Sequence, residues 1–491
     1  REERAAKKLD KLYSFMIHLR ISAGTINAKQ WQTLHETSEQ YGTGVLKVTT
    51  RQTVQLHGIL KHQLRPTLQS FDTVKLDSIA ACGDVNRNVI ATSHPSVSDV
   101  HAEVHAYADK ISSHLLPKTQ GYYEIFIDGE KIYDRVKEVD PLYENRYLPR
   151  KFKIAIAIPP TNDVDVFAND IGLIAIIEDG KLQGFNIAIG GGLATTHGNP
   201  NTYARLATVI GFVAGEEKVL KACYEVLTVQ RDNGNRSDRK LSRLKYTVDK
   251  MTVEGFKAEL EKRIGFKLEP ARAYTFTERG DRYGWQNVNN GTWYYTLFVE
   301  HGVVKPNQKA FLHELSLLDI CNFTFSGNQN LLLGEISTEN KATVIALIEK
   351  YEVEKAISEL RKNSMACVAL PTCPLALAEA QRYLPELVTK IEPILEKYAL
   401  QEEEITIRMT GCPNGCGRPY VSELGFVGTG PGHYNLMLGG DRYGTRLNRI
   451  YKEKVNEVQI LEEVDVLFEK YVKERLPKET FGDFSNRTLF N

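Results

Sequence analysis

Residues 405–417, ITIRMTGCPNGCG, run from a β-rich segment directly into two cysteines that lie in a glycine-rich turn. Residues 153–160, KIAIAIPP, make a similar transition from a β-rich segment into a proline turn. Three more pairs of segments match in the same order around these two stretches, namely 48–56 with 326–333, 88–95 with 367–374, and 185–192 with 434–441. Matches that keep one order predict an internal duplication, although α/β units also resemble one another through composition alone.

The duplication separates a half with a thiol cluster from a half without one. The alignment sets Asn88 and His94 opposite Cys367 and Cys373. The first half therefore keeps the scaffold and lacks these thiols. We expect a pseudo-twofold protein whose site lies at the junction of the two halves.

Short β-rich runs alternate with longer segments of helical periodicity, which is typical of a mixed α/β or α+β chain. The expected strands are 44–59, 153–158, 171–178, 183–189, 293–300, 405–410 and 433–438. The expected helices are 99–115, 203–212, 216–230, 252–264, 339–361, 374–397 and 458–474. We therefore expect an internally duplicated α+β fold.

The chain has 491 residues, enough for several domains with large cores. We expect boundaries near residues 80, 282 and 355. The expected division is 1–80 plus 283–355 as one domain, 81–282 as the first repeat domain and 356–491 as the second repeat domain.

The overall charge balance points to no nucleic-acid or membrane partner, since Lys plus Arg and Asp plus Glu both number 62. The sequence contains no run of about 18 apolar residues, so we expect no transmembrane helix. Seven cysteines are too few for a secreted disulfide scaffold, and we expect a cytoplasmic protein. The opening residues Arg1–Arg4 have no apolar leader, which we interpret as an interior point of a longer chain.

Four of the cysteines fall into two closely spaced pairs: Cys367 and Cys373 form Cys-x5-Cys, and Cys412 and Cys416 form Cys-x3-Cys. Four thiolates are the usual ligand set of a [4Fe–4S] cluster. A structural zinc site is the main alternative, but zinc sites typically use cysteine pairs two to four residues apart. Disulfides or unligated thiols are the third possibility.

Cations gather in three regions of the first half. In the first region, Arg150, Lys151 and Lys153 lie directly before a strand that we expect to be buried. The second region comprises Arg51 and Arg87, which lie beside the repeated segments. The third region contains Arg231, Arg236, Arg239, Lys240, Arg243 and Lys245. Such a run can be an ordinary solvated face, but guanidinium groups also bind carboxylates in a bidentate manner. A polycarboxylate cofactor therefore suits these residues, whereas nucleic acid does not, because no aromatic residues are interleaved with the cations.

These motifs together resemble the haemoprotein (β) subunits of assimilatory NADPH-sulfite reductases, within the wider siroheme nitrite and sulfite reductase family. The residues that carry the resemblance are the two cysteine motifs, Asn-Arg-Asn at 86–88, Tyr-Leu-Pro-Arg-Lys-Phe-Lys at 147–153, Gly-Gly-Gly at 190–192 and Asn-Gln-Asn at 328–330. The likeness runs through essentially the whole chain. It implies a fold with ferredoxin-like halves and siroheme at the domain junction.

The resemblance also implies the cofactors and their ligands. The siroheme iron would share the thiolate of Cys416 with a [4Fe–4S] cluster, whose remaining ligands would be Cys367, Cys373 and Cys412. The siroheme carboxylates and ring would be bound by a further set of residues, namely Arg51, Arg150, Arg231, Arg236, Arg239, Arg243, Asn328 and Gln329.

Sulfite would sit on the far side of the iron within a ring of cations. Arg87, Lys151 and Lys153 match the positions of that ring, whereas His18 stands where the family has an arginine. Cations stabilise the bound anion, and a lysine can supply protons to departing oxygen. Because histidine ordinarily titrates near neutrality, His18 would make the anion site weaker or more pH-dependent, unless it has only a structural role.

The function that the resemblance implies is the reduction of sulfite to sulfide in sulfate assimilation and cysteine biosynthesis. The electrons would come from a flavoprotein (α) subunit that carries NADPH, FAD and FMN, because this chain shows no Gly-x-Gly-x-x-Gly motif after a strand. A ferredoxin-dependent sulfite or nitrite reductase of the same fold is the first alternative. A non-catalytic metal-binding protein is the second.

Overall fold

The two repeats each contain a sheet of the same topology. The computed structural model describes residues 7–9, 13–95, 99–119, 124–134, 139–288 and 291–490, so the opening residues Arg1–Arg4 lie outside the described part. The first repeat sheet has the order β11-β10-β9-β8-β5, and the second has the order β20-β19-β18-β17-β16. In both sheets the first three strands along the chain run parallel to one another, and each of the last two pairs antiparallel with the strand before it.

The bounds of these strands confirm most of the β-rich segments expected from the sequence. In the first repeat they are β5(Ile90–Ala91), β8(Ile154–Ala157), β9(Ile171–Glu178), β10(Lys181–Ile189) and β11(Thr208–Val213). In the second repeat they are β16(Ser364–Ala366), β17(Ile407–Thr410), β18(Leu424–Gly430), β19(His433–Leu438) and β20(Arg449–Val455). The helix expected at 203–212 is wrong: its second part is β11, where β-branched and aromatic residues pair with β10.

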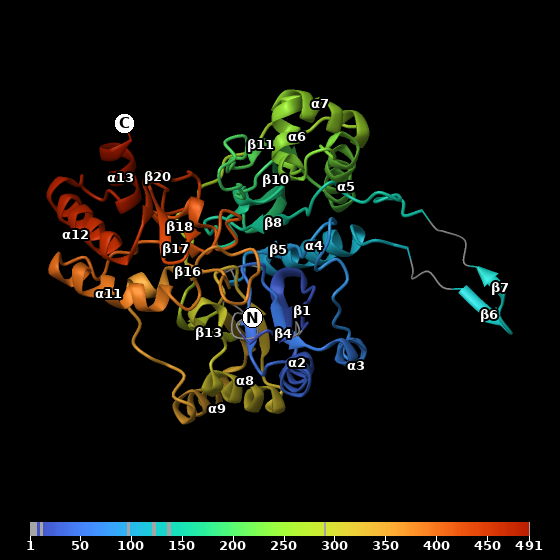
Figure 1. Ribbon diagram of the computed structural model, residues 1–491, viewed down its shortest axis with the longest axis horizontal. Helices are drawn as coiled ribbons and strands as arrows, with labels where there is room; N and C mark the ends of the chain where they lie inside the picture. The colour runs from blue at the N-terminus through green and yellow to red at the C-terminus, as the bar shows by residue number, and fades with distance from the viewer. Residues whose placement is uncertain are drawn as a thin grey trace.

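The helices of the repeats pack on the outer faces of these sheets (Figure 1). They are α4(Val100–His114), α5(Glu216–Asn233), α6(Leu244–Met251) and α7(Val253–Ile264) in the first repeat, and α10(Glu359–Lys362), α11(Leu384–Lys397), α12(Glu457–Glu474) and α13(Phe481–Leu489) in the second. The helix expected at 374–397 begins only at α11, which has a proline in its first turn. The preceding residues form turns, and these turns carry Cys373.

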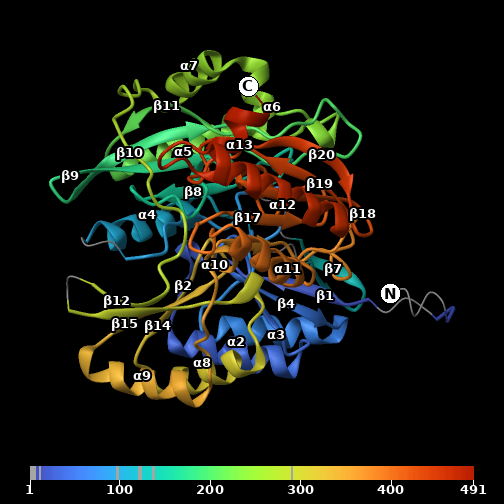
Figure 2. The same cartoon turned by 90° about the vertical axis from the view of Figure 1, so that its left-hand side faces the viewer.

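A third lobe is formed by two segments that are far apart in the sequence, residues 15–72 and 284–350 (Figures 1 and 2). One sheet contains β1(Phe15–His18), β4(Val54–Ile59) and β3(Leu46–Val48). The other contains β12(Gly284–Asn287), β13(Trp293–Leu297), β15(Leu331–Ile336), β14(Asn322–Phe325) and β2(Thr25–Ile26). Figure 2 shows its helices along one outer side of the molecule; they are α2(Ala28–Gln40), α3(Leu64–Asp72), α8(Pro306–Leu318) and α9(Thr338–Lys350).

This lobe is itself duplicated, because the order β1-β4-β3 recurs as β13-β15-β14. The segment expected as one strand at 44–59 is instead the hairpin β3–β4, and its equivalent is the hairpin β14–β15. Both hairpin turns contain a glutamine with left-handed backbone, Gln52 at φ 53° and Gln329 at φ 72°. Arg51 and Asn328 therefore occupy equivalent positions. A single apolar core joins the two parts, with Trp31 stacked on Phe323 at 5.1 Å between ring centroids.

The strand register corrects the alignment of the two repeats. Ala91 pairs with Ile156 in the first repeat, as Ala366 pairs with Met409 in the second. The next residues then make the same bond: Thr92 N–H donates to Ile156 and Cys367 N–H donates to Met409. Thr92 is therefore the equivalent of Cys367, and the alignment that placed Asn88 there is wrong.

The two repeats meet at a buried cluster of charges centred on Asp165. Asp165 and Arg418 occupy equivalent positions, directly before the 3-10 turns Val166–Ala168 and Pro419–Val421, and both have left-handed backbone. Their side chains form an ion pair at 2.8 Å across the junction. Arg279 and Arg408 bind the same carboxylate at 2.6 and 2.5 Å. One buried carboxylate thus compensates three buried guanidinium groups.

One two-stranded hairpin of the first half lies outside the three lobes. The hairpin of β6(Glu124–Ile127) and β7(Glu130–Asp134) extends away from the three lobes (Figure 1). Within the described part of the chain, no helix is long and apolar enough to cross a membrane.

Replacement of Asp165 by asparagine should destabilise the protein strongly. The substitution keeps the shape of the side chain but leaves three buried guanidinium groups without their shared counter-charge, a loss of about 3–5 kcal/mol. Asp465→Asn is the matched control, because Asp465 pairs with Lys397 on the surface and should cost at most about 1 kcal/mol. Urea unfolding followed by circular dichroism measures both, and equal midpoints for the two variants would contradict the central role of Asp165.

Candidate functional site

The four closely spaced cysteines lie where two neighbouring parallel strands of the second repeat end. Cys367 follows β16, and Cys412 and Cys416 lie in the turn after β17. The carboxyl ends of neighbouring parallel strands lie at one edge of a sheet. Cys373 reaches this edge through its N–H bond to the carbonyl of Ala369 in the turn that follows Cys367.

The thiols are close enough to affect one another electrostatically. Burial, followed by the charge of Cys416, raises the pKa of Cys367 to about 12. Burial also raises the pKa of Cys412, and the charges of Cys416 and Cys373 add to the shift. Burial is the main cause of both pKa shifts, and the charges of the neighbouring thiols add to it.

Four thiols gathered at the ends of two neighbouring strands match the ligand number of a [4Fe–4S] cluster. Within the described ranges, no group of three or more His, Cys, Asp or Glu side chains is close enough to hold one metal ion. A mononuclear zinc site requires four ligands at about 2.0–2.3 Å from one centre. A [4Fe–4S] cluster places an iron atom beside each thiolate and so needs more widely separated sulfurs.

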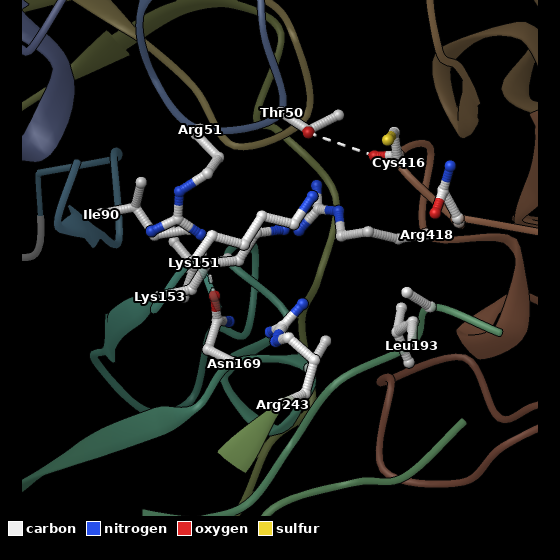
Figure 3. A pocket seen from close by; sticks show the side chains of 15 residues that line it. Thr50, Arg51, Ile90, Lys151, Lys153, Asn169, Leu193, Arg243, Cys416 and Arg418 are labelled. Carbon is white, nitrogen blue, oxygen red and sulfur yellow. Dashed lines mark hydrogen bonds between the residues drawn. The ribbon is translucent and has the colours of Figure 1, made fainter. Parts of the chain in front are cut away.

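Cys416 lines a cavity of about 530 Å³ at the junction of the repeats. Cationic side chains from four different segments enter this cavity from its sides (Figure 3). They are Arg51, Lys151, Lys153, Arg243 and Arg418. None of the fifteen lining residues is an aspartate or a glutamate, so positive charge is concentrated beside the thiol.

Backbone and amide groups hold the arginines in place. Arg51 donates to the side chain of Asn169 at 2.9 Å and to the carbonyl of Ile154 at 3.1 Å. Arg243 pairs with the buried carboxylate of Asp170 at 2.7 Å. Asp170 also accepts the backbone N–H of Lys153 at 2.9 Å, so one carboxylate positions two of the cavity residues.

The two lysines carry unpaired ammonium groups into the cavity. Neither Nζ atom has a hydrogen-bond or ion-pair partner among the described residues. Burial, followed by nearby charges that include Arg243 and Arg87, brings the pKa of Lys151 down to about 8. Burial and the charge of Arg51 also lower the pKa of Lys153 well below its usual range. An anion in the cavity would favour the protonated form of both lysines and raise these pKa values.

Arg87 and His18 lie beside the cavity rather than in its lining. Arg87 donates to the carbonyls of Gly83 and Ala81, both at 2.8 Å. Its charge contributes to the lowered pKa values of His18, Arg51 and Lys151. Arg87 therefore belongs to the same electrostatic cluster as the lining cations.

His18 does not titrate near neutrality, which corrects the expectation from the sequence. Burial, followed by the charges of Arg87 and Arg51, lowers its pKa to about 4. Its buried Nε2 atom has no hydrogen-bond partner in the described structure. His18 is thus a neutral side chain beside the cations at physiological pH.

Several residues expected at the cofactor make other contacts. Arg150 does not line the cavity; it lies 3.9 Å from Asp84, and its pKa is lowered by burial and then by Arg239 and Arg243. Five other residues expected at the cofactor do not line the cavity that contains Cys416. Arg231 is paired with Asp232 and Glu144, Arg236 is bound to backbone carbonyls, and Arg239 is paired with Asp84. Asn328 and Gln329 lie in the other hairpin turn.

Sequence reasoning missed Arg418, Asn169 and Asn414, which all line the cavity. Arg418 follows Cys416 by two residues, so its proximity to the cysteine motif was a usable signal. Asn169 could not be found in this way, because it lies far from the cysteines along the chain and its place depends on the duplicated fold.

The second repeat does not reproduce the cations of the first. The equivalent pairing of β8 and β17 places Glu404 and Thr406 where the first repeat has Lys151 and Lys153. Asn328 likewise replaces Arg51 in the equivalent hairpin. One repeat therefore supplies the thiols and the other supplies most of the positive charge, which explains a single site in a pseudo-twofold fold.

The residues present fit a polycarboxylate macrocycle with a thiolate-bound metal. The Nε atoms of Arg51 and Arg418 are buried and without partners in the described structure, which is costly unless a ligand supplies acceptors. Cys416 provides a soft donor to the same cavity. The cavity thus offers both a thiolate that could bind a metal and groups that would bind carboxylates.

Two family descriptions match parts of the chain. The one described as the nitrite/sulfite reductase ferredoxin-like half domain matches residues 7–73. The one described as the nitrite and sulphite reductase 4Fe-4S domain matches residues 106–268. The second match falls in the repeat that lacks the four thiols, in agreement with two repeats of one topology.

Relatives of known name match over almost the whole chain. A sulfite reductase (NADPH) hemoprotein beta-component from Leptospira biflexa is 57% identical over 99% of this chain and 89% of its own length. One from Geobacillus thermodenitrificans is 50% identical over 99% of this chain and 86% of its own length. Among solved structures, the NirA protein of Mycobacterium tuberculosis matches with a TM-score of 0.79 over 97% of this chain and 84% of that chain, at 24% identity, and so shares the fold.

Substitution of any one of the four cysteines at 367, 373, 412 and 416 by serine should reduce the bound iron and acid-labile sulfide. Serine is a harder and more basic ligand than thiolate, so the cluster would be incomplete or lost. Cys223→Ser is the matched control, because Cys223 is buried in the apolar core of the first repeat. Iron content unchanged in all four variants would contradict a cluster at these thiols.

His18 should stay uncharged from pH 8 down to about pH 5. Its pKa of about 4 lies below the usual 6.5, so the contribution of neutral His18 to stability is full above pH 6.5 and is lost as the pH falls toward 4. The Cε1–H resonance in histidine-labelled protein, assigned with His18→Gln, reports the titration. A midpoint above pH 6 would contradict the burial of His18 among cations.

Proposed function

This chain belongs to the nitrite and sulfite reductase family, beside the sulfite reductase (NADPH) hemoprotein beta-components, and we propose that it reduces sulfite to sulfide with electrons from a flavoprotein subunit. The carrying observation is a cavity at the repeat junction with one thiol, five cations and no carboxylate in its lining. The names of the relatives support the substrate and the NADPH-dependent partner.

We propose that Cys416 ligates a siroheme iron and shares its thiolate with a [4Fe–4S] cluster held by Cys367, Cys373 and Cys412. Siroheme supplies a redox-active iron that binds the substrate, and the cluster supplies electrons to it. The thiol of Cys416 is the member of the quartet that lines the cavity, which supports its role as the shared ligand.

The arginines would bind the carboxylates of the siroheme. Arg51, Arg243 and Arg418 line the cavity, and two of them have a buried Nε atom without a partner. A guanidinium fork binds a carboxylate with two parallel hydrogen bonds. Arg150 is a fourth candidate, because the charges of Arg243 and Arg87 help to lower its pKa. Arg231, Arg236, Arg239, Asn328 and Gln329 are outside the proposed site.

Lys151, Lys153 and Arg87 would bind sulfite and, in the case of the lysines, protonate it. A dianion that enters the cavity is attracted by ammonium groups that have no competing partner. Its charge raises the pKa of each lysine, so each is protonated when the substrate is bound. Each can then donate a proton to an oxygen that leaves as water. Neutral His18 would contribute a hydrogen-bonding ring rather than a charge.

We also propose the division into three domains and the cellular compartment that the sequence predicts. Three apolar cores, formed by residues 17–76 with 295–353, by residues mainly from 85–268, and by residues 360–484, support the division into three domains. None of the seven cysteines, all of which lie in the described ranges, forms a disulfide, which supports a reducing compartment such as the cytoplasm.

Lys153→Met should greatly reduce sulfite turnover while siroheme and iron contents stay near normal. The methionine removes the ammonium group from the anion site and keeps the length of the chain, so the expected loss is about 100-fold or more. Lys397→Met is the matched control, because Lys397 is exposed, is paired with Asp465 and lies outside the cavity lining. Sulfide production with reduced methyl viologen as donor measures both.

The same assay tests the proposal as a whole. The unsubstituted holoprotein should show siroheme absorbance and should turn over sulfite. A preparation that contains zinc instead of iron, or a fully loaded protein that reduces nitrite but not sulfite, would overturn the proposed function.

A further inference from the structure

Cys367 receives two hydrogen-bond donors from the end of β17. The backbone N–H of Gly411 lies 3.4 Å from its sulfur, and the hydroxyl of Thr410 lies 3.3 Å from the same atom. Thr410 is fully buried. Its hydroxyl has no hydrogen-bond partner other than this sulfur among the described residues.

The first repeat contains the same arrangement without the second donor. There Thr92 stands in place of Cys367, and its hydroxyl accepts the backbone N–H of Ile158 at 3.0 Å. Ile158 is the equivalent of Gly411 by the register of β8 and β17. The backbone donor is therefore a property of the scaffold that both repeats share.

The hydroxyl donor is present only in the repeat with the thiols. The residue equivalent to Thr410 is Ala157, which is buried in β8 and has no polar side-chain atom. A buried hydroxyl without a partner is costly, so an alanine would serve packing equally well at this point. The threonine thus matters for the sulfur that it faces.

A metal-bound thiolate can only accept hydrogen bonds. The Thr410 hydroxyl therefore donates to the sulfur once Cys367 is deprotonated. Such a bond withdraws electron density from the ligand and stabilises the more negative, reduced state of a cluster. Because the site is buried, the effect is stronger than it would be in water.

We propose that Thr410 is a positioning residue that makes the cluster easier to reduce, by a hydrogen bond from its hydroxyl to the sulfur of Cys367. This inference rests on the proposed function, since it requires a cluster at the four thiols. The Thr410 hydroxyl would help to set the reduction potential of the cluster, and so the driving force for electron transfer to the site. Its effect would be distinct from that of the backbone N–H of Gly411.

The test is a redox titration of the holoprotein, followed by the EPR signal of the reduced cluster. Thr410→Val keeps the shape of the side chain and removes the hydroxyl, so the equilibrium constant for reduction should fall by about three- to tenfold. Thr410→Ser retains a hydroxyl and should keep a potential close to that of the unsubstituted protein.

Thr92→Val is the matched control. It removes the equivalent hydroxyl in the repeat without thiols, and it should leave the reduction potential of the cluster unchanged. A shift in Thr410→Val that is absent from Thr410→Ser and Thr92→Val supports the proposal. Thr410→Val with full iron and siroheme contents and an unchanged potential would overturn it.

Two further outcomes keep the inference separate from the proposed function. If Thr410→Val fails to assemble the cluster, Thr410→Ala against Thr410→Ser decides: a lower potential in the alanine variant alone supports the proposal, and equal potentials overturn it. Absence of iron from the unsubstituted protein would overturn the proposed function and this inference together, whereas sulfite turnover with no shift in any variant overturns this inference alone.

Discussion

Positive charge gathered around a single thiol is the constraint on which the rest of the structure depends. Five cations line the cavity of Cys416, and no carboxylate lines it with them. Burial of these groups and the repulsion between their like charges are both unfavourable, and together they lower the pKa values of Lys151 and Lys153. The cations are held in place by residues behind them, chiefly Asp170 and the carbonyl groups bound by Arg51. A ligand rich in negative charge removes this electrostatic penalty, so the folded protein favours the binding of such a ligand.

The duplication explains how one chain builds this asymmetric site from two similar halves. The sheets, the hairpin turns and the 3-10 turns at the junction are shared, and Asp165 pairs with its own structural equivalent, Arg418. The differences lie in a few side chains at equivalent positions. Thr92 corresponds to Cys367, Ala157 to Thr410, and Lys153 to Thr406. One half has become a source of charge and the other a source of metal ligands, while the backbone that carries them is the same.

The sequence predicted the duplication, the α+β class, most strands and the cysteine quartet, because these depend on local patterns. It failed where the outcome depends on distant contacts. The helix expected at 203–212 overlaps β11, which pairs with β10, and Asn88 was aligned with Cys367 although strand register puts Thr92 there. The expectation that His18 titrates near neutrality was wrong, because the sequence does not show the burial of this residue beside Arg87 and Arg51. Arg231 and Arg236 had the right residue type but are engaged with other groups.

The central claim is that four thiolates of the second repeat hold an iron–sulfur cluster joined through Cys416 to a siroheme beneath the cations of the first repeat. Mössbauer spectroscopy of the iron-57-enriched holoprotein tests it most directly, because a shared thiolate couples the electron spins of the two centres. The account predicts that the cluster irons show magnetic splitting imposed by the siroheme iron. Spectra in which the cluster and the haem behave as independent centres, or in which no cluster iron is present, would contradict it.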